Sequence, residues 1–80
     1  MTITYIPKGV CSRQISFDIE DNIVTNVKFV GGCNGNLQGI SKLVEGMPAD
    51  KIIEKLQDIR CGAKFTSCPD QLAHAIKENI

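Results

Sequence analysis

Four cysteines are the residues of this chain with the clearest capacity for chemistry: Cys11, Cys33, Cys61 and Cys68. Thiolates bind metal ions, attack electrophiles and exchange disulfides, so cysteines that gather in one place predict a metal or thiol site. None of the four falls on the apolar stripe of a predicted strand or helix, where a cysteine that only fills the core would stand. We therefore expect a shared site, with Cys61 either as a member of it or as a thiol packed beneath a loop.

The sequence lacks several motifs that would identify a particular kind of site. No CxxC pair is present, so the spacing indicates neither a zinc ribbon nor a thioredoxin-type dithiol. There is also no glycine-rich phosphate loop and no suggestive Ser-His-Asp set. We expect His74 to face solvent and Asp70 to complement a helix dipole, rather than to ligate a metal. Arg13 either stabilises a thiolate or lies on a strand surface.

The elements that must position the cysteines begin with three antiparallel strands, in which apolar residues alternate with polar ones. Three sets of residues define them: Ile3 and Tyr5; Ile15, Phe17 and Ile19; and Ile23, Thr25, Val27 and Phe29. A two-residue turn at Asp21 and Asn22 would throw the second and third sets onto opposite faces of the sheet. We therefore predict a three-residue loop that begins at Glu20 and places Ile19 opposite Ile23.

Three helices follow the strands, because the apolar spacing changes from two residues to three and four. The second begins near Pro48, and its buried face extends to Ile59. The third begins at Pro69, with Cys68 as its cap and Ile80 turned inward. Strands followed by helices predict an α+β fold, a three-stranded antiparallel sheet followed by three helices packed on one face.

These elements place every cysteine at the end of a strand or helix. Cys11 precedes the second strand and Cys33 follows the third, so both lie at the same end of the hairpin and can approach one another. Cys33 and Cys68 also stand at the start of a helix, where the positive end of the dipole favours the thiolate. The glycines on either side of Cys33 would let the backbone come close to an anion or a metal-bound sulfur.

Composition and charge limit the partners. The nine basic and nine acidic residues cancel and form no basic block, so we expect no nucleic-acid partner. The N-terminus lacks the pattern of a signal peptide, and no stretch approaches the ~20 apolar residues that cross a bilayer. We expect a cytoplasmic protein with no membrane partner, whose thiols stay reduced. Residues 1–80 fit one domain, small enough that a metal or a homodimer partner would add useful stability.

Residues 5–12, 31–37, 61–62 and 66–72 together resemble the stand-alone TSCPD-domain proteins. The motif that names this family, Thr-Ser-Cys-Pro-Asp, stands unbroken at residues 66–70, and the resemblance covers nearly the whole chain. A similar domain ends the adenosylcobalamin-dependent ribonucleotide reductases, where its cysteines are taken to bind metal. The resemblance therefore implies a metal-binding module without self-sufficient catalysis.

A more distant likeness connects the chain to the NifU/IscU-type iron-sulfur scaffolds, which also run from a hairpin through a Gly-Cys turn into helices. On that template three cysteines take the ligand positions: Cys11, Cys33 and Cys68. Arg13 and Ser67 stand where the scaffolds have Asp and His, which argues against an exchangeable cluster. Cys61 would complete a closed four-thiolate site suited to zinc. The implied cofactor is thus zinc or an iron-sulfur cluster.

Two other functions stay open at this point. The resemblance alone implies a role in ribonucleotide reduction, with the protein as an accessory partner of a ribonucleotide reductase or as a thiol donor in deoxyribonucleotide synthesis. A complete reductase is excluded, because 80 residues leave no room for a nucleotide site and a radical cofactor. The other alternative is a dimeric interaction domain in which the cysteines only pack.

Overall fold

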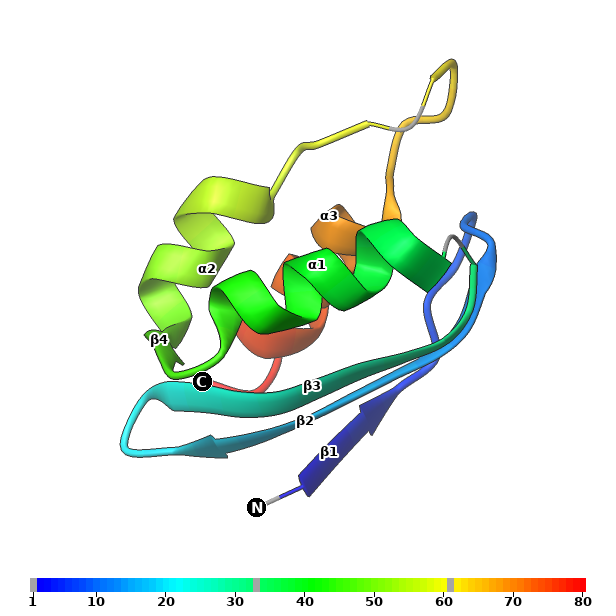
Figure 1. Cartoon of the computed structure of the whole chain (residues 1–80). Helices are drawn as coiled ribbons and strands as arrows, with labels where there is room; N and C mark the ends of the chain where they lie inside the picture. The colour runs from blue at the N-terminus through cyan, green and yellow to red at the C-terminus, as the bar shows by residue number, and fades with distance from the viewer. Residues whose placement is uncertain (1, 33, 61) are drawn as a thin grey trace.

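The computed structural model describes residues 2–32, 34–60 and 62–80. Within them an antiparallel sheet of four strands, in the order β1-β2-β3-β4, carries three helices on one face (Figure 1). The elements are β1 Thr2–Tyr5, β2 Ser12–Glu20, β3 Ile23–Gly31, α1 Asn34–Val44, β4 Met47–Pro48, α2 Ala49–Leu56 and α3 Cys68–Lys77. The predicted α+β class with an antiparallel sheet and three helices is confirmed. The predicted count of three strands is wrong, because β4 pairs with the first two residues of β3.

The hairpin of β2 and β3 closes through a two-residue turn, so the predicted three-residue loop is wrong. Glu20 pairs with Ile23, and Ile19 pairs with Val24. The turn residues 21–22 have φ angles of 50° and 66°. Positive φ at both positions belongs to the mirror-image turn whose twist matches that of the strands it joins.

A β-bulge keeps the apolar residues on one face in spite of this short turn. The register shifts between Ser16 and Asp18 of β2, and Asn26, opposite that stretch, has a φ of 54°. An extra residue in one strand reverses the facing of every residue beyond it. Val24 and Val27 are therefore both buried although an odd number of positions separates them.

The core lies between the sheet and the helices. Its buried members are Ile15, Phe17, Val24, Val27, Val44, Ala49, Ile52, Leu72, Ala75 and Ile76. Two residues predicted to face inward lie outside it, since Ile59 is 40% exposed and Ile80 62%. The helix α2 ends before Ile59 because Gln57 is extended, with ψ at 147°, and Asp58 has a φ of 67°.

The other face of the sheet carries polar side chains, as the alternation along each strand requires. Asp18, for example, accepts hydrogen bonds there from Thr2 Oγ1 and from Asn26 Nδ2. None of the helices in the described ranges has the length and apolar character that a membrane crossing would need.

Candidate functional site

The start of α3 is built by the consecutive residues 66–70, Thr-Ser-Cys-Pro-Asp. Ser67 is the N-cap, and its Oγ accepts a hydrogen bond from the Asp70 N–H at 3.1 Å. Pro69 stands in the first turn, where a residue without an N–H leaves no helical bond unmade. Cys68 is therefore the first residue of the helix, and the prediction that it is the cap is wrong by one position. Serine takes the cap because its hydroxyl reaches the N–H of the third helical residue.

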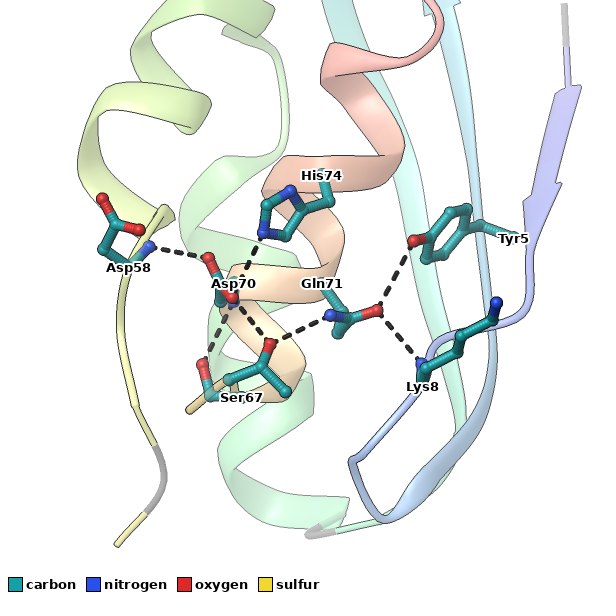
Figure 2. A network of polar contacts seen from close by, with 8 residues as sticks. Tyr5, Lys8, Asp58, Ser67, Asp70, Gln71 and His74 are labelled. Atoms are coloured by element: carbon teal, nitrogen blue, oxygen red, sulfur yellow. Dashed lines mark hydrogen bonds and ion pairs between the residues drawn. The ribbon is translucent and has the colours of Figure 1, made fainter. Parts of the chain in front are cut away.

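The Asp70 carboxylate is the centre of a buried hydrogen-bond network (Figure 2). Its Oδ2 accepts from Thr66 Oγ1 at 2.6 Å, and its Oδ1 accepts from the backbone N–H of Asp58 at 2.6 Å. The His74 Nε2 lies 3.3 Å from Oδ2. Asp70 does more than complement the helix dipole, because it fixes both ends of the loop between α2 and α3 to one carboxylate.

Burial and hydrogen bonding act in opposite directions on the pKa of Asp70. Burial raises the pKa of this carboxyl, whereas the hydrogen bonds from Thr66 and Asp58 and the nearby His74 lower it. The net effect is a lowered pKa, so Asp70 is ionised at neutral pH. The His74 side chain is half exposed, which confirms the expectation that it faces solvent.

Gln71 extends the network from α3 to the N-terminal part of the chain (Figure 2). Its Nε2 donates to Thr66 Oγ1 at 2.9 Å, and its Oε1 accepts from the Lys8 N–H at 3.1 Å. The Tyr5 hydroxyl lies at 3.5 Å from the same oxygen. The sequence analysis assigned no structural role to Thr66 or Gln71, although both lie within residues 66–72, which carry the family resemblance.

The two described cysteines lie at the end of the fold where the β1–β2 loop, the end of β3 and the starts of α1 and α3 meet (Figure 1). The Cys68 Sγ is 3.1 Å from Ser12 Oγ, and both side chains are buried. Cys11, the neighbour of Ser12, is exposed. Ser12 is thus the neighbour of Cys11 along the chain and the neighbour of Cys68 through its side chain. The predicted ligands Cys33 and Cys61 lie outside the described residues.

Gly32 allows the backbone at the end of β3 to approach Cys11. A Cβ at this position would stand 2.9 Å from Leu37 Cδ1 and 3.2 Å from Cys11 Sγ, and its φ is 80°. Both the positive φ and these close distances disfavour a side chain at this position. At Gly35 a Cβ would meet nothing within 4 Å. The approach of these glycines to an anion or a metal-bound sulfur stays a prediction.

The described residues do not by themselves complete a metal site. In residues 2–32, 34–60 and 62–80, no group of three or more His, Cys, Asp or Glu could hold a metal ion. A site built on the described thiols, Cys11 and Cys68, would have two ligands and would need Cys33 or Cys61 as well. Sulfur donors suit zinc and iron-sulfur centres, and a hydroxyl beside a ligand sulfur is a typical outer-shell partner. The donors fit such a centre in type.

Comparison with known proteins adds one finding. The family model of the TSCPD domain matches residues 1–80, which is the whole chain. No curated protein and no solved structure matches the chain.

Proposed function

Because this chain belongs to the TSCPD domain family, we propose that it is a small cytoplasmic metal-binding module without self-sufficient catalysis. Zinc or an iron-sulfur centre is its cofactor in this proposal. The ligands are Cys11, Cys33 and Cys68, with Cys61 as the fourth. One observation carries the proposal: Ser12, the residue that follows Cys11, has its hydroxyl 3.1 Å from the Cys68 Sγ.

The contacts of the described residues support this arrangement in two steps. Ser12 Oγ lies 3.1 Å from the Cys68 Sγ, and Cys11 is the preceding residue in the chain. A Cβ at Gly32 would stand 3.2 Å from the Cys11 Sγ, so the Gly32 backbone passes close to this thiol. The described backbone beside two of these cysteines, Cys11 and Cys68, therefore lies together at one end of the fold.

The chain's own residues would stabilise a ligand thiolate at this end. The Ser12 hydroxyl can donate to the Cys68 sulfur, and such a bond lowers the energy of a buried anion. Four thiolates would suit a closed structural zinc site, which adds folding energy to a domain of this size. Three thiolates with an open position would suit an iron-sulfur centre better.

Metal analysis tests the proposal directly. Protein purified with and without oxygen should contain about one equivalent of zinc, or iron together with acid-labile sulfide. Substitution of Cys11, Cys33 or Cys68 by serine should lower the metal content, and Cys61→Ser serves as the comparison. A four-thiolate site loses metal in all four variants, whereas a three-thiolate site keeps it in Cys61→Ser. Metal-free protein from both preparations, with reactive thiols and an unchanged far-UV CD spectrum, would refute the proposal.

A second candidate function is that of a thiol donor or accessory partner of a ribonucleotide reductase. The exposure of Cys11 favours it, because a thiol must be accessible to attack a disulfide of another protein, and the buried Cys68 is not. In such an exchange two thiols here would be oxidised while a disulfide of the partner is reduced. The rate of exchange with a disulfide peptide should then fall in Cys11→Ser and persist in Cys68→Ser. Equal rates in both variants would refute this function.

A further inference from the structure

A polar pocket of about 340 Å³ lies between α3 and the end of β1. Six residues line it: Tyr5, Lys8, Gln71, His74, Lys77 and Glu78. Gln71, His74 and Glu78 follow the spacing of one helix face, so α3 forms one wall of the pocket. Tyr5, at the end of β1, and Lys8 form the other wall. The volume is near the lower end of the range for small-molecule sites. The pocket lies beyond the first turn of α3 and includes no cysteine.

The floor of this pocket is held in place by buried hydrogen bonds (Figure 2). Gln71 is 8% exposed, and both ends of its amide are bound, to Thr66 Oγ1 and to the Lys8 N–H. His74 directs its Nε2 at Asp70, which leaves Nδ1 for a ligand. Polar groups fixed in this way can meet a ligand with little loss of conformational entropy.

The lining carries more positive than negative charge, although the chain as a whole is balanced. Lys8 and Lys77 stand against Glu78 alone, because the carboxylate of Asp70 is turned to His74. Across the described ranges neither lysine forms an ion pair. Burial, and then the nearby Glu78, raise the pKa of Tyr5, so its hydroxyl stays a hydrogen-bond donor at neutral pH.

We propose that this pocket binds a small phosphate monoester through Lys8 and Lys77, with Nδ1 of His74 as a further donor when the imidazole is charged. The donors come from two walls, and a tetrahedral group with three terminal oxygens can accept from several directions at once. A planar carboxylate presents two oxygens in one plane and fits such donors less well. The small excess of charge favours a compact ligand over a polyanion.

An NMR titration at constant ionic strength tests this site. Inorganic phosphate, glycerol phosphate and acetate would be added to the ¹⁵N-labelled protein, with chloride adjusted to keep the salt level constant. We expect saturable shifts at the Gln71 side-chain amide and at the His74 backbone amide, with a lower Kd for the phosphates than for acetate. A lower Kd for glycerol phosphate than for inorganic phosphate identifies the ester as the preferred form, whereas the reverse order overturns the assignment to esters.

A pair of double variants provides the matched control. Lys8→Ala with Lys77→Ala should weaken phosphate binding by about tenfold or more, as expected for two lost charge-assisted hydrogen bonds. The bond from Lys8 to Gln71 involves the main chain and is kept in this variant. Lys28→Ala with Lys42→Ala removes the same charge from the groove between β3 and α1, and it should leave the Kd within about twofold. Equal weakening in both double variants, or no saturable shift below about 10 mM phosphate, would overturn the proposal.

Discussion

Replacement of Asp70 by asparagine should destabilise the protein strongly, although the two side chains have the same shape. The carboxylate accepts on both oxygens, from the Asp58 N–H on one and from the Thr66 hydroxyl on the other. Asparagine has one acceptor oxygen, and its NH₂ group is a donor. The new NH₂ group would face either the Asp58 N–H, which is a second donor, or the Thr66 hydroxyl, which would then have to turn its own proton away and leave it without this acceptor. Either arrangement loses a hydrogen bond in a site that is 3% exposed.

The expected loss follows from these contacts. A hydrogen bond to a charged acceptor contributes about 1.5–3 kcal/mol, and a buried donor without a partner costs about 1–3 kcal/mol. Because solvent is largely excluded, we expect Asp70→Asn to lower the free energy of unfolding by about 2–4 kcal/mol. Domains of this length have a total of about 4–12 kcal/mol, so the midpoint of thermal unfolding should fall by about 10 °C or more.

Urea unfolding at neutral pH, followed by far-UV CD, measures this free energy. Asp18→Asn is the matched control, because Asp18 also accepts two side-chain hydrogen bonds but does so on the open face of the sheet, where water can replace them. We expect a clearly smaller loss in the control. An Asp70→Asn protein within about 0.5 kcal/mol of the parent would refute the central role of this carboxylate.

The same pair of proteins should show a defined pH dependence. The pKa of Asp70 is lowered in the folded state, below an unfolded value of about 3.9. Its contribution is therefore fully present above the unfolded pKa and is lost as the pH falls through the folded pKa. The difference in stability between the parent and Asp70→Asn should shrink as the pH falls below about 5. A difference that grows in this acid range would contradict the direction of the shift.

Three further outcomes are expected. Gly32→Ala should lower the midpoint of thermal unfolding, because its Cβ would stand 2.9 Å from a neighbouring side chain, whereas Gly39→Ala in α1 meets nothing within 4 Å and should add up to about 1 kcal/mol. Similar effects of the two would contradict the crowding at Gly32. Asn22→Gly should exceed Asn22→Ala in stability by about 1 kcal/mol in urea unfolding, because this residue has a φ of 66° and both variants lose the same side chain. Glu78→Gln should move the pKa of Tyr5 down toward its ordinary value in an absorbance titration, and no movement would mean that burial alone raises it.

The class of fold could be predicted from the sequence, because the apolar spacing of strands and helices can be recognised even where a bulge interrupts a strand. The register of the hairpin could not, because it depends on a bulge. Asn22 in the turn and Asn26 in the bulge both adopt positive φ. Asparagine tolerates this conformation without requiring it, so the sequence alone does not show that Asn26 forms a bulge. With the bulge unrecognised, an unbroken alternation required a longer turn and gave the wrong partner for Ile19.

The fourth strand had no signal of its own. β4 consists of Met47 and Pro48, and it pairs with β3 only because the chain leaves α1 beside the start of that strand. A pairing this short reflects tertiary position and not the local preference of its residues.

The predicted gathering of four cysteines at one end of the fold stays a prediction. Among the described residues, Ser12 follows Cys11 in the chain and has its hydroxyl 3.1 Å from the Cys68 Sγ. The polar network at Asp70 and Gln71 could not be predicted, because Gln71 accepts from Lys8, which is 63 positions away in the chain. Such pairs arise only when α3 has packed against the sheet.

The double attachment of one loop to Asp70 has a consequence for how this fold can vary. The Asp58 N–H and the Thr66 hydroxyl donate to the same carboxylate, so the two ends of the loop between them are held together. The entropic cost of closing a loop rises slowly with its length, by about 0.6 kcal/mol for each doubling. Segments inserted after Gly62, which keep Cys61 in place, should therefore leave the domain folded, so this part of the loop can accept sequences of different length.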